Sequence, residues 1–202
     1  MLSRLVAILG SCAVVGVSLA AQEGPEVVAD LRPGDTPAAN VRVLGLLRDR
    51  RFVRAMESGF PLYMEYQVSL KQPRGIWWDR TVAIDAWQFV VVFDPVRSIY
   101  VLEDAEGSEE LGGEAALAGR LAAVYVVTME PPEPGDYYFE ATVEARTLSD
   151  EDVDEVFAWL EGDSAITKRP GFVTRTARKI LVRIAPLPRV RLVSRTQEFV
   201  HR

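Results

Sequence analysis

The sequence predicts an α+β fold, a single domain built mainly from an antiparallel β-sheet with about three to four flanking helices. Two long stretches of alternating polarity, residues 62–70 and 76–93, are joined by the turn Gln72-Pro73-Arg74-Gly75. Short turns between consecutive strands favour antiparallel pairing. Apolar residues at helical spacing occur before, between and after the strands, which indicates helices packed on a sheet.

Each remaining element follows from its own pattern. Alternation or apolar runs predict a short strand near Val41 and Val43 and further strands over 98–102, 124–129, 137–148 and 189–200. Helical spacing and capping residues predict helices over 48–58, 114–121, 149–161 and 170–184. The expected inward-facing set of the 76–93 strand changes from Val82 and Ile84 to Trp87, Phe89, Val91 and Phe93. Such a change of parity predicts a β-bulge near Asp85.

The first 21 residues have the parts of a secretory signal peptide. Arg4 supplies the positive charge, residues 5–20 are almost wholly apolar, and Ser18-Leu19-Ala20 places small residues before a cut at Ala21. We therefore expect a signal peptide over 1–21, a linker or loose N-terminal segment over 22–39, and the α+β domain over 40–202. Export to the periplasm or cell envelope follows. An uncleaved anchor in the inner membrane and a lipoprotein modified at Cys12 are the alternatives.

Charge is distributed unevenly along the chain. The net charge of −6 does not suit a general nucleic-acid binder. Residues 103–163 hold 18 acidic against two basic side chains, and residues 164–202 hold ten basic against one acidic. Opposite surfaces attract, so we expect the two segments to fold against each other.

Most catalytic and metal-binding devices are absent from the sequence. The only cysteine is Cys12 and the only histidine is His201. A nucleophile–histidine device or a zinc site therefore has no residues to use within the domain. Asp150, Asp152, Asp154 and Glu161 have calcium-loop spacing, but Glu155 stands where such a loop needs glycine. We expect a protein without metal or cofactor that is not an enzyme.

One enzymatic alternative remains. Two carboxylates facing each other across a cleft suffice for glycoside hydrolysis. Glu65, Asp79 and Asp85 lie on the first two long strands. A carboxylate-dependent hydrolase requires at least two of them to converge.

The run Trp77-Trp78-Asp79-Arg80 is the most unusual local feature. Adjacent residues of a strand point to opposite faces, so one tryptophan enters the core more easily than both. A structural interpretation places one in the core and one over a sheet edge, with Asp79 and Arg80 pairing nearby. A functional interpretation makes the four residues an interaction surface, because exposed tryptophan is enriched at binding hot spots.

Several short motifs together resemble one protein family. They are Gly59-Phe60-Pro61-Leu62 at the start of a strand, Trp77-Trp78-Asp79, an aromatic-rich strand ending at Phe93, a strand over 98–102, and the run 181–188 leading to Ser194 and Phe199. The chain is similar over about residues 40–200 to the exported bacterial proteins grouped as domain of unknown function 4390. The resemblance implies an envelope location and a small, mostly β domain, and it assigns no site residues.

The leading functional hypothesis is a non-catalytic envelope protein that binds a protein partner or helps to assemble one. A peripheral membrane module is the alternative, since the expected 170–184 helix carries a basic face made of Arg175, Arg178, Lys179 and Arg183. The carboxylate-dependent hydrolase is the third hypothesis.

Overall fold

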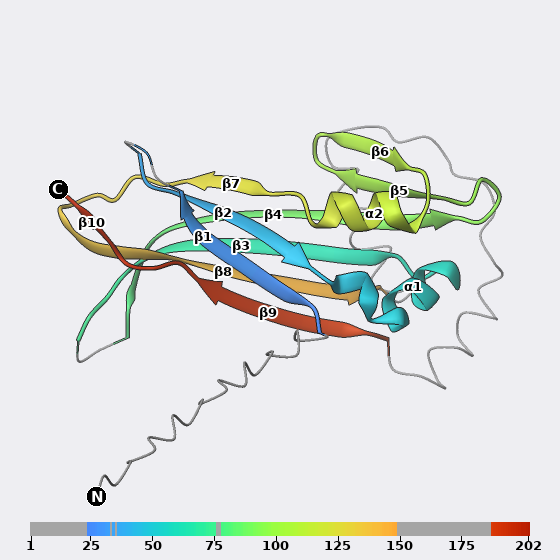
Figure 1. Cartoon of the computed structure of the whole chain (residues 1–202), viewed down its shortest axis with the longest axis horizontal. Helices are drawn as coiled ribbons and strands as arrows, with labels where there is room; N and C mark the ends of the chain where they lie inside the picture. The colour runs from blue at the N-terminus through green and yellow to red at the C-terminus, as the bar shows by residue number, and fades with distance from the viewer. Residues whose placement is uncertain (1–23, 33, 35, 76–77, 149–186) are drawn as a thin grey trace, which may run out of the picture.

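The computed structural model describes residues 24–32, 34, 36–75, 78–148 and 187–202 (Figure 1). Strands and helices follow in the order β1 Glu26–Arg32, β2 Ala38–Leu44, a 3-10 turn Leu46–Arg48, α1 Arg50–Glu57, β3 Leu62–Gln72, β4 Arg80–Asp94, β5 Ile99–Asp104, β6 Gly107–Leu111, α2 Glu114–Leu121, β7 Tyr125–Thr128, β8 Gly135–Thr147, β9 Arg189–Arg195 and β10 Phe199–His201.

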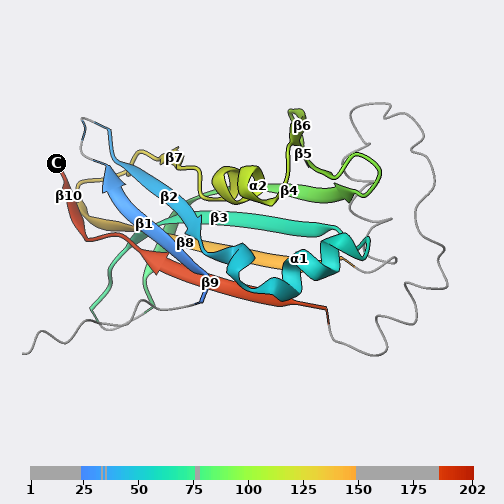
Figure 2. The same ribbon diagram turned by 45° about the vertical axis from the view of Figure 1, so that its right-hand side comes forward.

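Two antiparallel sheets pack face to face. The small sheet has the strand order β1-β2-β7, and the large sheet has the order β10-β8-β3-β4-β5-β6, with β9 also paired to β8. Both β9 and β10 pair with β8, at different positions along it. The small sheet lies across the large one in both ribbon views (Figures 1 and 2). One side of the sandwich is closed, because β1 contacts β9 and β8.

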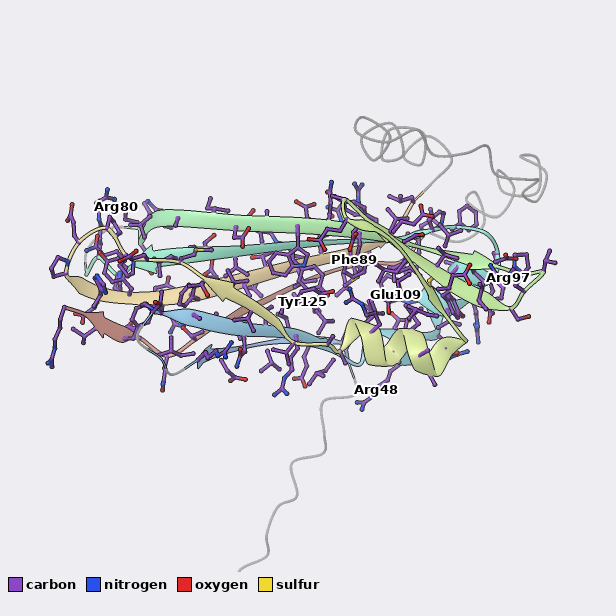
Figure 3. All side chains as sticks on the ribbon, turned by 90° about the horizontal axis from the view of Figure 1, so that it is seen from above. Arg48, Arg80, Phe89, Arg97, Glu109 and Tyr125 are labelled. Carbon is purple, nitrogen blue, oxygen red and sulfur yellow. The ribbon has the colours of Figure 1, made fainter. Side chains whose placement is uncertain are left out.

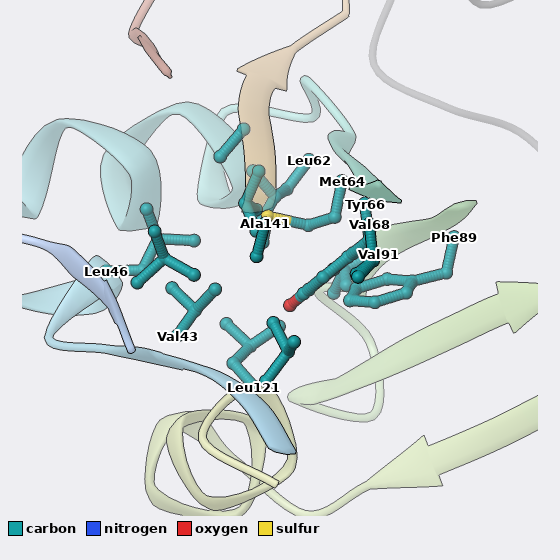
Figure 4. Packing of buried hydrophobic residues seen from close by; sticks show 14 of the residues in the cluster. Val43, Leu46, Leu62, Met64, Tyr66, Val68, Phe89, Val91, Leu121 and Ala141 are labelled. Carbon is teal, nitrogen blue, oxygen red and sulfur yellow. The ribbon is translucent and has the colours of Figure 1, made fainter. Parts of the chain in front are cut away.

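Strand β3 is the centre of the large sheet. It pairs with β4 on one side and with β8 on the other along almost its whole length. Its inward-facing side chains are fully buried between the sheets and are Leu62, Met64, Tyr66, Val68 and Leu70. They meet residues of β2, α1 and α2 in one continuous cluster, part of which is drawn in Figure 4.

Helix α1 begins and ends where its flanking residues dictate. The Asp49 carboxylate accepts a hydrogen bond from the Arg51 amide at 3.1 Å, as an N-cap residue does. Gly59 follows the helix with φ of 88°, a left-handed conformation in which a Cβ is strained. Phe52, Val53 and Met56 form the buried stripe of the helix.

The antiparallel, single-domain α+β architecture is confirmed, but the expected number of helices is not supported. Only two α-helices occur in the described residues, at the two places expected from helical spacing between 48 and 121. The expected helices over 149–161 and 170–184 lie outside the described residues. Within the described part of the chain, no helix has the length and apolar character needed to cross a membrane.

The expectation of a linker or loose segment over 22–39 is wrong where the structure describes those residues. Strand β1 lies within that segment and pairs with β2 along seven residues, with Val27 and Ala29 in the core. Gly34 and Pro37 lie between the two strands. Turn-forming residues that suggested a linker therefore belong to the connection of a hairpin.

The bulge expected near Asp85 occurs earlier in β4. Leu70 pairs with Ala83 and Lys71 with Thr81, which leaves Val82 as the extra residue. Both Val82 and Ala83 then pack against the core, while Ile84 is 60% exposed on the opposite face. The alternation of Val82 and Ile84 suggested that both face the core. A bulge instead places two successive residues, Val82 and Ala83, on one side, so Ile84 faces the other way.

The acidic and basic segments meet where both are described. Arg195 and Arg191 of β9 lie opposite Glu140 and Glu144 of β8, and Arg189 forms an ion pair with Glu144 at 2.7 Å. The charge asymmetry thus marks neighbouring strands, at least for β8 and β9.

Substitutions in β1 test whether this strand is part of the folded core. Val27 is 8% exposed and faces the core, whereas its neighbour Val28 is only half-buried. We expect Val27→Ser to lower the free energy of unfolding by about 2 kcal/mol and Val28→Ser to lower it by about half as much or less. Urea denaturation of both variants measures the difference. Equal effects would show that β1 is not docked as described.

Candidate functional site

The tryptophan-containing turn between β3 and β4 presents one large aromatic side chain to solvent. Trp78 is 92% exposed, and Trp77 lies outside the described residues. Arg80 begins β4 opposite Gln72. Asp79 accepts hydrogen bonds from the Tyr138 hydroxyl at 2.6 Å and from the Arg74 amide at 3.2 Å. The hydrogen bond between Tyr138 and Asp79 therefore holds the turn against β8, and Trp78 is the neighbour of Asp79 in the chain.

The Asp79–Tyr138 hydrogen bond perturbs both groups. The bond from Tyr138 lowers the pKa of the Asp79 carboxyl below its usual value, and the Arg74 amide adds to this effect. Burial and then the Asp79 bond raise the pKa of Tyr138 to about 12. These shifts stabilise the loop and do not prepare either group for proton transfer near neutral pH.

The three carboxylates of the hydrolase hypothesis do not share a site. Glu65 lies opposite Gln88 and is exposed on the outer face of the large sheet. Asp85 lies opposite the buried Val68 and so faces the inner side of the sheet. Asp79 is in the turn, bound to Tyr138. The expected basic face, Arg175, Arg178, Lys179 and Arg183, lies outside the described residues.

Strand β4 has a long free edge that the sequence analysis did not single out. It contains 15 residues, of which five, Val90–Asp94, pair with β5, which leaves ten, 80–89. These ten pair only with β3 among the described residues. Strand β7 is likewise an edge strand, paired only with β2 there. Figure 3 shows this open side of the sandwich, with Phe89 and Tyr125 on its two margins.

Aromatic side chains fill the seam between the two free edges. The Tyr66 and Trp87 rings are stacked with centroids 5.0 Å apart. Tyr125 of β7 lies with its ring centroid 5.2 Å from that of Trp87 and 5.3 Å from that of Tyr66. Among the described residues, side chains alone therefore join the sheets on this side, whereas β1 and β9 approach each other on the opposite side.

A pocket opens on the last part of this free edge. Its volume is about 680 Å³, within the range of small-molecule sites. We call it the β4 pocket, and its lining residues are Glu65, Ala86, Trp87, Gln88, Phe89, Asp104, Ala105, Glu106, Arg120 and Tyr125. The pocket therefore combines in one concave surface four consecutive residues of β4, the turn between β5 and β6, and Tyr125 of β7.

The charge of the β4 pocket is negative. Arg120 is the one basic residue of its lining, and its guanidinium is bound to Glu109 at 2.8 Å and to the Tyr125 hydroxyl at 2.5 Å. The acidic residues of the lining are Glu65, Asp104 and Glu106. No ion pair to these three carboxylates occurs within the described part of the chain.

Two buried polar atoms at the seam have no hydrogen-bond partner among the described residues. They are the Tyr66 hydroxyl and the Trp87 indole nitrogen. Tyr66 is fully buried, and burial raises the pKa of its hydroxyl far above the ordinary range. Figure 4 shows its side chain reaching from β3 toward Leu121 of α2. An unpartnered buried hydroxyl costs about 1–3 kcal/mol, so it needs a compensating role or a ligand.

One sequence feature pointed to this site. The expected strand over 76–93 was much longer than its successor over 98–102, and antiparallel neighbours of unequal length leave an unpaired edge. Trp87 and Phe89 were correctly expected to face inward. That Tyr125 lies across from them is a tertiary fact, which strand patterns alone do not contain.

A matched pair of tyrosine substitutions tests the unpartnered hydroxyl. We expect Tyr66→Phe to raise the free energy of unfolding by about 1 kcal/mol, because it removes a buried polar group without a partner. Tyr137, also fully buried, donates to the Glu133 carbonyl at 2.9 Å, so Tyr137→Phe is expected to lower it by about 1 kcal/mol. Denaturant titration compares them. A loss of stability in Tyr66→Phe equal to that in Tyr137→Phe would show that the Tyr66 hydroxyl is satisfied.

Titration of Asp79 tests the hydrogen bond that joins the β3–β4 turn to Tyr138 of β8. Removing the Tyr138 hydroxyl in Tyr138→Phe is expected to raise the pKa of Asp79 toward about 3.9, while Tyr63→Phe leaves it unchanged. Since the folded-state pKa is depressed, the bond adds stability above that unfolded-state value and loses it as the pH falls. Titration of the carboxyl ¹³C resonance by NMR measures this pKa. A pKa of Asp79 that is the same in Tyr138→Phe as in the unsubstituted protein would contradict the Asp79–Tyr138 hydrogen bond.

Comparison with known proteins assigns a family and little else. No curated protein and no solved structure matches the chain. The family model described as a domain of unknown function (DUF4390) matches residues 46–149, from the 3-10 turn to just beyond β8. This match contains the whole β4 pocket and confirms the resemblance found in the sequence. The chain belongs to the family grouped as domain of unknown function 4390.

Proposed function

We propose that this protein is an exported, non-catalytic module of the cell envelope that binds an extended segment of a partner protein at the free edge of β4. The observation that carries this proposal is the edge Ala86–Phe89, which lines the β4 pocket and pairs with no strand but β3 in the part of the chain that the structure describes. Backbone groups of such an edge can pair with an added strand, and the adjoining pocket can receive alternate side chains of that strand.

The first half of the free edge is protected against strand addition. The bulge at Val82 interrupts the ladder, and the Asp85 carboxylate lies on the inner face of an edge strand. Bulges and inward-pointing charges are common devices that prevent unwanted pairing at sheet edges. Neither device is present over Ala86–Phe89, and that accessible stretch is where the pocket lies.

Export is supported by the apolar leader over 1–21. The non-catalytic part of the proposal rests on the divergence of Glu65, Asp79 and Asp85 and on the lack of a histidine before His201. The membrane alternative needs the basic residues of 175–183, which the structure does not describe.

Site-specific photocrosslinking in the native host tests the binding surface. A photoreactive phenylalanine analogue replaces Ala86 in the β4 pocket, and separately replaces Trp78, Val96 or Val193, which are 92%, 91% and 58% exposed elsewhere. We expect an adduct with an envelope protein at position 86 that positions 96 and 193 do not give.

The same experiment can contradict the proposal in two ways. An adduct at position 78 without one at position 86 would move the binding surface to the tryptophan-containing turn. Adducts with lipid alone would favour the membrane module. N-terminal sequencing of the purified variants checks export, with an expected start between about residues 20 and 24, and a retained Met1 contradicts cleavage.

A further inference from the structure

We infer that the segment bound in the β4 pocket carries a basic side chain next to the Asp104–Glu106 turn and, on its inner face, an apolar side chain with a hydrogen-bond acceptor. This inference rests on the proposed function and specifies the chemistry of the partner. It follows from the position of the free edge relative to β5, from the acids without ion pairs among the described residues, and from the unpartnered indole donor of Trp87.

Strand β5 fixes where an added strand would lie. Val90 of β4 pairs with Glu103, the last-but-one residue of β5, and Asp104 and Glu106 then begin the turn into β6. Residues 86–89 continue the same edge of β4 beyond that turn. A strand paired with them is therefore collinear with β5, and one of its ends meets the turn.

The turn offers negative charge at that end. Asp104 Oδ1 accepts the amides of Glu106 and Gly107 at 2.9 and 3.1 Å, which holds the turn in shape. Glu106 is exposed and takes part in no ion pair within the described residues. Glu65 adds a third acid, one strand away on the outer face beside Gln88. With Arg120 bound to Glu109, a lysine or arginine of the partner is the complementary group.

The inner face of the same edge favours a different kind of partner side chain from the outer face. Successive residues of an added strand point to opposite faces, so alternate positions meet Trp87, Phe89 and Tyr125. The Trp87 indole nitrogen can only donate, and it has no acceptor among the described residues. A side chain that fits here is apolar along its length and presents an oxygen acceptor, as threonine, glutamine or tyrosine does. The expected partner segment therefore alternates basic residues on its outer face with apolar or acceptor-bearing residues on its inner face.

A selection from random peptides tests this chemistry without knowledge of the partner. A phage-displayed library of random decapeptides is selected on the mature protein purified from the periplasm. We expect the enriched peptides to carry lysine or arginine in alternation with apolar or acceptor-bearing residues. Enrichment of neutral or acidic peptides at the β4 edge would overturn the inference while leaving the proposed function intact. Absence of any enriched peptide at that edge would overturn both.

Variants of the protein then separate charge and hydrogen-bond contributions for one selected peptide. Glu106→Gln is expected to weaken binding by about two- to five-fold, the range of a partly exposed ion pair. The matched control Glu198→Gln carries its substitution between β9 and β10, on the opposite margin of the large sheet, and should bind normally. Trp87→Phe, which removes the indole N–H of a residue that lines the pocket, is expected to weaken binding about three- to ten-fold, whereas Tyr137→Phe should not.

Chemical-shift mapping of the labelled protein shows where the peptide sits. The expected result is a change at the Ala86–Phe89 amides and the Trp87 indole, with salt-sensitive affinity. Binding that is unaffected by Glu106→Gln and insensitive to salt would refute the role of the turn. Equal losses in Trp87→Phe and Tyr137→Phe would refute the role of the Trp87 indole donor.

Discussion

The pairing of β3 with a strand on each side is the constraint on which the rest of the structure depends. Because β3 is bonded to both β4 and β8, its inward residues Leu62 to Leu70 are held in one plane and are fully buried. The small sheet and both helices then cover that plane. A strand in the middle of a sheet has no free backbone groups, so any capacity of the described strands to bind by pairing must lie further out, at β1, β4, β6, β7, β9 or β10.

Closure on one side and opening on the other give the sandwich its asymmetry. Strand β1 reaches β9 and seals one margin, which is why the N-terminal hairpin belongs to the domain. At the other margin β5 covers only five residues of β4. The gap is bridged by Tyr66, Trp87 and Tyr125, whose rings bury apolar area without offering backbone partners. An aromatic seam of this kind keeps the core dry while leaving the strand edge accessible.

Local sequence patterns predicted most helices and strands of the described residues, but they predicted less well how these elements pair and pack. Alternation predicted β3 and β8, and local sequence patterns predicted α1, with Gly59 after its end, and α2, because these features depend on neighbours in sequence. The position of the bulge depended on which residue of β4 is left without a partner in β3, and the ladder skips Val82 rather than Asp85. The β1 hairpin was missed because Gly34 and Pro37 mark a turn as readily as a linker. The site was missed because Trp87 and Tyr125 are 38 positions apart (125 minus 87) and meet only in the folded chain.

Stability and binding place opposite demands on the seam. A phenylalanine at position 66 would fill the same space without an unpartnered hydroxyl, and a shorter β4 would remove an unpaired edge that invites aggregation. The bulge and Asp85 show that half of this edge is already protected, so the exposure of Ala86–Phe89 is not a general property of β4. Features that lower stability beside a concave surface are those expected of a functional site. The proposed bound segment would account for features of the β4 pocket that folding alone does not require.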